Sequence, residues 1–168
     1  MVQIRTETEA DRASVHEVNE SAFETAAEAN LVDMLREQAS QVISLVACIQ
    51  TEIVGHIMLS PVELSGHQGL KIMGLAPMAV TPEHQRKGIG TKLVRAGLKE
   101  CEMLGIGAVA VLGHPEFYPR FGFIPSSRFG IVSEYEVPEE VFMIRELEAG
   151  YLNGLSGTIK YHTAFSNV

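Results

Sequence analysis

Residues 80–91 combine the residue types that hold a phosphate group: glycines, cations and the expected start of a helix. The segment reads Val80-Thr81-Pro82-Glu83-His84-Gln85-Arg86-Lys87-Gly88-Ile89-Gly90-Thr91. The first turn of a helix offers unpaired N–H donors and a partial positive charge. Glycines let the backbone approach an anion because no Cβ is in the way, and Arg86 and Lys87 add full positive charges. We therefore predict a phosphate site in this segment.

The spacing of the glycines separates three kinds of phosphate site. A nucleotide P-loop ends in Gly-Lys-Ser/Thr, whereas this chain has Gly90-Thr91-Lys92. The dinucleotide fingerprint needs a third glycine where this chain has Leu93, and a carboxylate at the end of the next strand. That expected strand ends instead in Gly113-His114-Pro115. What remains is the pattern Val-x-Pro-x-x-Gln-x-x-Gly-x-Gly, or a plain glycine-rich helix start with solvated cations.

This pattern resembles the coenzyme A pyrophosphate loop of the GCN5-related N-acetyltransferases, the GNAT superfamily. Members of that superfamily typically carry a Tyr, three residues and then Gly-Phe after the fifth strand, and this chain has Tyr118-Pro119-Arg120-Phe121-Gly122-Phe123. The longer stretch 112–123 is similar to the YhbS-type branch of predicted acetyltransferases. So is the tail, from Phe142-Met143 through residues 155–161 to Ala164-Phe165. The resemblance therefore runs over nearly the whole chain.

The resemblance implies an α/β fold in one domain over residues 1–168. It implies a mixed, mostly antiparallel twisted sheet flanked by helices, with a splayed pair of central parallel strands. Apolar periodicity and turn residues predict elements in a matching order. We expect a strand at 3–5, helices at 8–22 and 31–38, a hairpin of 43–49 and 53–64, a turn at 65–69, a strand at 71–80, a helix at 89–104, a strand at 108–112 and a short helix from Pro115. Residues 123–137 are expected to form a loop with a broken strand.

The resemblance also implies acetyl-CoA as cosubstrate, and direct transfer of its acetyl group to a primary amine. The residues that it places against the cofactor are Met78, Ala79, Val80, Gln85, Arg86, Lys87, Gly88, Ile89, Gly90 and Thr91. Pro77 cannot donate a ladder hydrogen bond, so we expect a break in strand pairing beside it. The resemblance implies that the acyl chain of the cofactor enters such a gap; the alternative is a bulge with no ligand. The Met78 N–H is the expected donor to the thioester oxygen. Glu83 and His84 are expected to face solvent.

Two residues are predicted to be catalytic, Tyr118 and His114. Tyr118 occupies the family position for the group that donates a proton to the departing thiolate. Its alternative role is an aromatic ring packed beneath the cofactor, because a tyrosine of pKa ~10 is a reluctant acid. The candidates for the general base are Glu24, Glu28, Glu63, His114 and a chain of water. His114 ends the fifth expected strand, and imidazole exchanges protons near neutral pH; it could equally cap the helix expected from Pro115.

Composition bounds the partners and the location. A hydrophobic content of 46% and a charged content of 20% are typical of globular proteins, and no apolar run approaches the ~18 residues of a membrane span. The N-terminus lacks the apolar core of a signal peptide. We therefore expect a cytoplasmic protein without membrane contact. A net charge of −8 argues against a nucleic-acid surface. The expected partner is a small-molecule or peptide amine, and a homodimer is left open.

Neither the cysteines nor the histidines suggest a metal site. Cys48 and Cys101 have neither disulfide nor zinc spacing, so we expect both in the core. The histidines are scattered, with no pair at ligand spacing. We therefore expect no metal.

Two other functions are compatible with these features. The first is a non-catalytic sensor that holds coenzyme A or an acyl-CoA with the same loop and without turnover. The second is a structural or toxin-partner protein that keeps the fold and has lost the ligand. Tyr118 and the intact loop favour an enzyme. Residues 123–137 are the candidate region for acceptor contacts, because loops on a rigid scaffold carry specificity; the alternative is a solvated connector.

Overall fold

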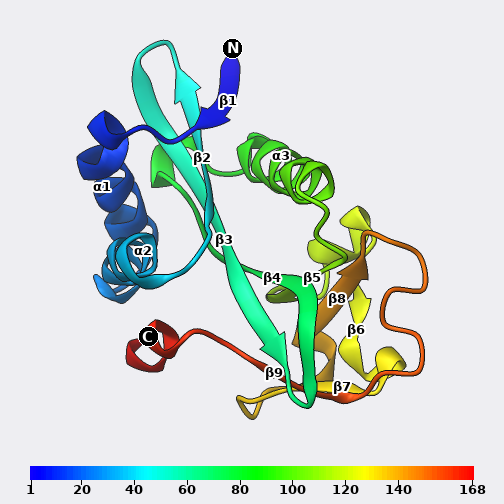
Figure 1. Ribbon diagram of the computed structural model, residues 1–168. Helices are drawn as coiled ribbons and strands as arrows, with labels where there is room; N and C mark the ends of the chain where they lie inside the picture. The colour runs from blue at the N-terminus through cyan, green and yellow to red at the C-terminus, as the bar shows by residue number, and fades with distance from the viewer.

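Within the described part of the chain, nine strands form one sheet that has helices on both faces (Figure 1). The computed structural model describes residues 1–168, apart from the side chain of Asn167. The strands are β1 (Val2–Thr6), β2 (Ile43–Ile49), β3 (Glu52–Leu64), β4 (His67–Val80), β5 (Ala108–Leu112), β6 (Ile124–Pro125), β7 (Ile131–Ser133), β8 (Phe142–Glu146) and β9 (Gly157–Lys160). The α-helices are α1 (Arg12–Ala22), α2 (Ala27–Gln38) and α3 (Ile89–Met103). Short 3-10 helices are η1 (Glu9–Asp11), η2 (Pro82–His84), η3 (Tyr118–Phe121), η4 (Ser126–Phe129), η5 (Glu139–Val141) and η6 (Thr163–Asn167).

The strand order is β1-β2-β3-β4-β5-β8-β6, and β9 pairs with both β3 and β7. Neighbouring strands are antiparallel except β4 with β5 and β7 with β9. This is the mixed, mostly antiparallel sheet that we predicted. The turn predicted over residues 65–69 is wrong in length, because β4 already begins at His67, which pairs with Leu64. Two residues are enough to reverse an antiparallel chain, so His67, Gln68 and Gly69 already belong to the strand.

Both faces of the sheet are covered, and consecutive residues of the central strand β3 are buried on opposite sides. Ile57 belongs to the apolar cluster that includes Leu93 of α3. Met58, the next residue, belongs to the cluster that includes Val15 of α1 and Leu35 of α2. Side chains alternate across a strand, so a strand covered on both faces is apolar almost throughout. The sequence of β3 therefore reflects helices on either side of it.

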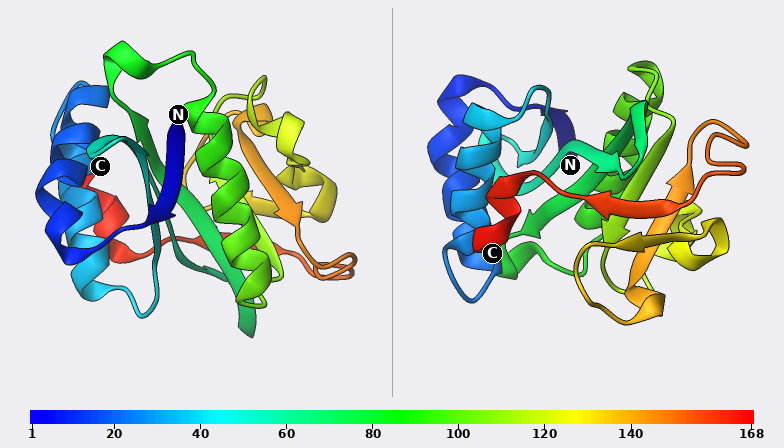
Figure 2. Two further views of the ribbon diagram at one scale, coloured as in Figure 1. Left: turned by 90° about the horizontal axis from the view of Figure 1, so that it is seen from above. Right: turned by 60° about the horizontal axis from the view of Figure 1, so that its bottom comes forward.

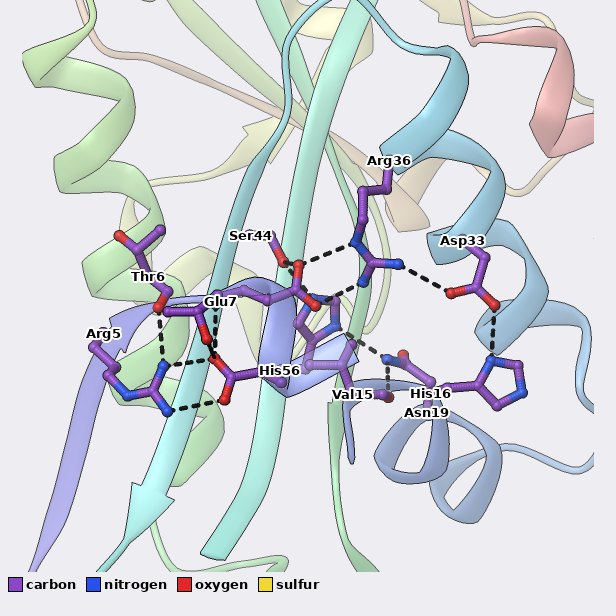
Figure 3. Close-up of polar contacts among 12 residues, drawn as sticks. Arg5, Thr6, Glu7, Val15, His16, Asn19, Asp33, Arg36, Ser44 and His56 are labelled. Atoms are coloured by element: carbon purple, nitrogen blue, oxygen red, sulfur yellow. Dashed lines mark hydrogen bonds and ion pairs between the residues drawn. The ribbon is translucent and has the colours of Figure 1, made fainter. Parts of the chain in front are cut away.

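A buried chain of polar contacts ties the layer of α1 and α2 to the sheet (Figure 3). Glu7 accepts hydrogen bonds from Arg36 of α2 at 2.6 Å and from Ser44 Oγ of β2 at 2.9 Å. His56 Nε2 of β3 lies 2.8 Å from the same Oγ, and Asn19 Nδ2 of α1 lies 3.0 Å from His56 Nδ1. When Nε2 carries the hydrogen, each of these contacts has one donor and one acceptor.

The ring of His56 is neutral in this chain of contacts. Burial and, after it, the charge of Arg36 lower the pKa of His56 to about 3. Arg36 also donates to Asp33 at 3.0 Å, and Asp33 lies 2.9 Å from Nδ1 of His16 on α1 (Figure 3). The polar chain therefore fixes where α1 and α2, and with them their junction, lie over the sheet.

The last residues of the chain return to the α1–α2 side of the sheet. β9 pairs with the end of β3, where Leu64 faces Ile159, and η6 lies against α2 (Figure 2). Ala164 of η6 is buried in the same apolar cluster as Leu31 of α2. The C-terminal segment therefore forms part of the wall beside the α1–α2 junction. None of the described helices is long and apolar enough to cross a membrane.

Candidate active site

The parallel strands β4 and β5 separate partway along their length. They pair only where residues 72–75 lie opposite residues 108–111. Beyond Leu75, a bulge places Ala76 and Pro77 opposite Met58 of β3, because the register there shifts between residues 57 and 59. A bulge bends the strand that carries it, and Pro77 has no N–H to give to a neighbour. The splayed pair of parallel strands that we predicted is therefore present.

The backbone of the turn between β4 and α3 is compatible with an anion site. Arg86 (φ 64°) and Gly88 (φ 84°) are both left-handed, and successive N–H groups in such a turn face one concavity. Glycine adopts this conformation without cost, whereas for Arg86 it is sparsely populated. α3 begins without a side-chain cap and without an acidic residue in its first turn. Its first N–H groups therefore face no competing carboxylate within the helix.

Two side-chain contacts fix this turn onto the end of β4. Gln85 Nε2 donates a hydrogen bond to the Val80 carbonyl at 2.9 Å. Thr81 Oγ1 lies 3.0 Å from His84 Nδ1. We expected His84 to face solvent, but it is half-buried, whereas Glu83 is exposed as expected. Gln85 of the motif therefore stabilises the conformation of the loop through a hydrogen bond to the end of β4.

A first cavity of about 710 Å³ lies beside this turn. It is lined by every predicted cofactor residue except Lys87, namely Met78, Ala79, Val80, Gln85, Arg86, Gly88, Ile89, Gly90 and Thr91. A Cβ on Gly90 would stand 3.4 Å from Met78 Cε and 3.9 Å from Phe117 Cζ, which both belong to the wall. The missing side chain of Gly90 therefore leaves space at the cavity. Lys87 is exposed and lies outside this lining, so its contact with a cofactor stays a prediction.

The first cavity also contains residues that the sequence did not predict for it, Ala22, Phe23, His84, Phe117 and Arg120. Phe117 and Arg120 lie in the stretch that carries the family resemblance. No sequence pattern indicated Ala22 and Phe23, because they reach the cavity only through the position of the end of α1. The Arg120 guanidinium lies 4.9 Å from the centre of the Phe117 ring. Among the described lining residues there are arginines and histidines and no Asp or Glu. A polyanion fits this surface.

A second cavity of about 510 Å³ adjoins the first, and Phe23, Met78 and His114 line both. It lies where β4 leaves β5. Its other walls are Glu28, Leu31, Leu75, Ala76, Pro77, Leu112, Gly113, Tyr118, Tyr135, Tyr161, Phe165 and Val168. Both predicted catalytic residues, Tyr118 and His114, therefore lie at this cavity.

Tyr118 begins η3, a four-residue 3-10 helix. The helix predicted from Pro115 is wrong in its start and length, because Gly122 takes a left-handed conformation (φ 88°) and ends η3 after one turn. The Tyr118 ring packs edge-on against Phe117 and Phe123, at centroid distances of 5.0 and 5.7 Å. Burial raises the pKa of Tyr118 to about 12. The hydroxyl therefore keeps its proton at neutral pH and is a hydrogen-bond donor.

The structure brings together only two of the side chains considered as general bases. Glu28 of α2 and His114 line the second cavity. Glu63 is exposed on β3, opposite Lys160 of β9, and Glu24 is exposed outside both cavities. Alternation along β3 explains the position of Glu63, since its neighbours Val62 and Leu64 are the buried ones.

Four of the second cavity's wall residues lie beyond the motif that ends at Phe123, namely Tyr135, Tyr161, Phe165 and Val168. Tyr135 lies in the region 123–137 that we expected to contact the acceptor. Tyr161 and Phe165 belong to the tail that resembles the YhbS-type branch, but nothing in their spacing predicted a cavity wall. They reach the site because β9 pairs with β3 and η6 lies against α2.

The cysteines are buried, as predicted. Cys101 lies in the apolar cluster beneath α3, and burial raises the pKa of its thiol to about 12. In the described part of the chain, no group of three or more His, Cys, Asp and Glu side chains could hold a metal ion.

Comparison with known proteins agrees with this geometry. A family model described as an acetyltransferase (GNAT) domain matches residues 3–125. The chain is 33% identical over 164 residues to the uncharacterized N-acetyltransferase YhbS of Escherichia coli K12, covering 97% of this chain and 98% of that protein. It is 38% identical over 134 residues to the uncharacterized N-acetyltransferase YjhQ of the same strain, covering 77% of this chain and 74% of that protein.

Solved structures give the same result. The crystal structure of E. coli YhbS in complex with CoA has a TM-score of 0.92 at 32% identity, covering 98% of this chain and 92% of that one. A GNAT family acetyltransferase from Brucella melitensis in complex with acetyl-CoA has a TM-score of 0.81 at 31% identity, covering 98% of each chain. The predicted family and fold class are confirmed: the chain belongs to the GNAT acetyltransferase family.

Proposed function

We propose that this protein transfers the acetyl group of acetyl-CoA directly to a primary amine. The observation that carries the proposal is the junction of the two cavities at Phe23, Met78 and His114. At this junction the first cavity, which is basic and lies beside the N-terminus of α3, adjoins the second cavity at the gap between β4 and β5. The first suits the pyrophosphate of coenzyme A, and the second suits the acceptor. The CoA and acetyl-CoA complexes of the two similar structures support this assignment.

In this proposal the backbone holds the cofactor. The N–H groups from Arg86 to Thr91 bind the pyrophosphate, and the bare Cα of Gly90 lets it approach the start of α3. The Met78 N–H donates to the thioester oxygen as negative charge develops on it. The Val80 carbonyl already accepts from Gln85, so it belongs to the support of the loop.

Tyr118 donates a hydrogen bond to the departing sulfur. Because burial raises its pKa to about 12, whereas a thiol of the cysteine type has a pKa of ~8.5, a full proton transfer from Tyr118 to the thiolate is uphill. A hydrogen bond that strengthens as charge develops on sulfur needs no such transfer. The proton that the thiolate finally takes is the one that the amine loses, and His114 and Glu28 are the side chains at the cavity that can carry it.

The state of the cysteines favours direct attack over a covalent acetyl-enzyme. A thiolate is the nucleophilic form of cysteine, and both thiols are buried away from the cavities. The amine nitrogen therefore attacks the thioester carbon, the C–N bond forms, and the C–S bond breaks. Residues 1–168 serve this reaction as one domain, since β1 and β9 lie in the same sheet. The cytoplasmic location and the homodimer stay predictions.

The experiment mixes the protein with acetyl-CoA and a panel of primary amines, and follows free thiol and acetylated amine together. The proposal predicts equal amounts of both. Coenzyme A alone should raise the melting temperature of the protein by mass action. A protein that binds coenzyme A tightly but releases thiol only at the rate of hydrolysis with every amine would be the sensor instead.

A further inference from the structure

The charged side chains at the second cavity are acidic. Its described lining contains one carboxylate, Glu28, and no Lys or Arg. A second carboxylate, Glu134, accepts a hydrogen bond from the N–H of the wall residue Tyr161. An ammonium group can be paired at such a surface. A carboxylate or phosphate on the acceptor would be desolvated there without a Lys or Arg partner, which is unfavourable.

One wall of the second cavity is a continuous set of aromatic rings. Tyr135 and Tyr161 are stacked, with centroids 5.5 Å apart and an interplanar angle of 29°. Tyr161 and Phe165 follow at 5.2 Å and 48°. Tyr135 is 39% exposed, so this wall reaches the surface. Aromatic rings bury large flat apolar surfaces and prefer other aromatic rings in offset or edge-on contact.

The size and chemistry of the cavity fit a small molecule better than a peptide. Its volume of about 510 Å³ falls in the ~300–1,000 Å³ range of small-molecule sites. A peptide would bring N–H and C=O groups at every residue, and each of them would need a partner. The rings of Tyr135, Tyr161 and Phe165 and the side chains of Leu31 and Leu112 line the cavity largely with apolar surface, which gives a peptide backbone few partners.

We propose that the acceptor is a small arylalkylamine, meaning a primary amine on a short carbon chain that ends in an aromatic ring and carries no anionic group. The ring packs against the wall of Tyr135, Tyr161 and Phe165, and the ammonium group is held on the side of Glu28. After losing its proton, the nitrogen reaches the cavity junction at Met78 and His114. This inference rests on the proposed function, because it names the acceptor of that transfer.

The substrate test uses acceptors that differ in one feature. Phenylalanine is 2-phenylethylamine with an added carboxylate, and a peptide with N-terminal phenylalanine adds a backbone. We expect kcat/KM for 2-phenylethylamine to exceed that for phenylalanine by about 100-fold or more, because the carboxylate finds no Lys or Arg in the cavity lining. It should exceed that for the peptide as well. Equal or faster acetylation of phenylalanine or of the peptide would overturn the inference.

The aromatic wall has its own test. Tyr135→Ala removes an exposed ring and should leave the fold intact. It should raise KM for 2-phenylethylamine about 10-fold, with little change in kcat, and this increase should be larger than that for ethylamine, which has no ring. Val132→Ala is the matched control, because Val132 is exposed on the same segment and outside the cavity lining. An unchanged KM in Tyr135→Ala would remove that ring from the acceptor site. Tyr161→Phe keeps its ring and should keep the preference, whereas Tyr161→Leu should weaken it.

A binding measurement separates the failure of this inference from the failure of the proposed function. Calorimetry on the protein saturated with coenzyme A should detect 2-phenylethylamine and not phenylalanine. Acetylation of other amines only, without binding of 2-phenylethylamine, would overturn the acceptor class and leave acetyl transfer standing. Selective binding without acetylation of any amine would support the ligand class of the cavity and contradict the transfer.

Discussion

The side chain of Gln85 donates a hydrogen bond from Nε2 to the carbonyl of Val80, 2.9 Å away, across the turn that joins β4 to α3. Both the donor and the acceptor of this hydrogen bond belong to the protein. It connects the last residue of the strand that borders the gap to the loop that precedes the helix N-terminus. The shape of the proposed pyrophosphate loop and the position of β4 are therefore coupled through one amide.

Gln85→Ala should weaken coenzyme A binding without unfolding the protein. An ordinary hydrogen bond contributes about 0.5–1.5 kcal/mol, so we expect the Kd of coenzyme A to rise roughly 2- to 12-fold. The free energy of unfolding of the free protein should change little, since Gln85 is exposed. Gln68→Ala makes the same substitution at an exposed position near the other end of β4 and should leave the Kd unchanged. Titration calorimetry measures both, and equal Kd values for the two variants would contradict the role of Gln85.

Glu7 and Arg36 should be far more important for stability than a surface pair. Their side chains are only 7% and 12% exposed and lie 2.6 Å apart. Removing one partner of a buried pair leaves an uncompensated charge, at a cost of about 3–5 kcal/mol. We expect Glu7→Gln to fall at the low end of that range, because Asp33 still pairs with Arg36.

The matched control for Glu7→Gln is Glu102→Gln. Glu102 is half exposed and 3.9 Å from Arg145, so its loss should cost less than about 1 kcal/mol. Urea unfolding monitored by circular dichroism gives both values. Similar losses in the two variants would mean that the polar chain of Figure 3 does not hold α1 and α2 on the sheet.

The buried ring of His56 should make stability depend on pH in a defined window. Its pKa in the folded protein is about 3, against an unfolded value of ~6.5. Between these values the unfolded chain binds the proton and the folded one does not, so the stabilisation is complete above pH ~6.5 and is lost as the pH falls toward 3. The His56 contribution should reach a slope of at most about 1.4 kcal/mol per pH unit.

Urea unfolding at a series of pH values between 5 and 7 measures this slope. His56→Gln should be less stable at pH 7 and should show a flatter slope over that interval. The slope is the diagnostic quantity, because any disruptive substitution lowers the stability itself. An unchanged slope in His56→Gln would contradict the neutral buried ring.

Tyr118→Phe should lower kcat and leave KM for acetyl-CoA nearly unchanged. A hydrogen bond to a charged group contributes about 1.5–3 kcal/mol, and the charge on sulfur exists mainly in the transition state, so kcat should fall roughly 10- to 100-fold. Since the pKa of Tyr118 is about 12, the rate should show no alkaline decline from this group below pH ~10.

Tyr151→Phe is the control for the tyrosine substitution. The Tyr151 hydroxyl accepts from the Lys71 N–H, and Tyr151 lines neither cavity, so activity should be kept. A loss of less than about threefold in Tyr118→Phe, with chemistry rate-limiting, would leave Tyr118 as a packing residue.

The central strands and the loop could be predicted from sequence because their signals are local. Alternating and continuous apolar runs located β2 to β5 within a few residues, and the spacing of Gln85, Gly88 and Gly90 identified the loop. The turn predicted before β4 is too long, because a glycine such as Gly69 usually marks a turn but here lies within the strand. The helix expected from Pro115 is only one 3-10 turn, η3. Gly122 ends it by taking a left-handed backbone conformation, and the sequence alone does not give that backbone angle.

The lining of the second cavity, the proposed acceptor site, could be predicted only in part, because tertiary contacts bring its residues together. Tyr161 lies far along the chain from Glu28, and the two reach one cavity only through the pairing of β9 with β3 and the packing of η6 on α2. The same holds for Phe23 at the end of α1. No local pattern distinguishes such residues from ordinary core residues, whereas Tyr118 and His114 were found because they lie in the motif itself.

The most direct test of the central claim compares the products formed by the wild-type protein and by Gly90→Val. A side chain at Gly90 would extend toward Met78 and Phe117 in the cavity wall, while the free protein keeps its fold. With acetyl-CoA and the amine panel, the wild type should form one acetylated amine for each thiol released, measured by mass spectrometry and thiol titration. In Gly90→Val, kcat/KM for acetyl-CoA should fall about 100-fold or more, whereas Lys99→Val, on the exposed side of α3, should match the wild type. Thiol release without acetylated amine, or equal activity in wild type and Gly90→Val, would contradict the account.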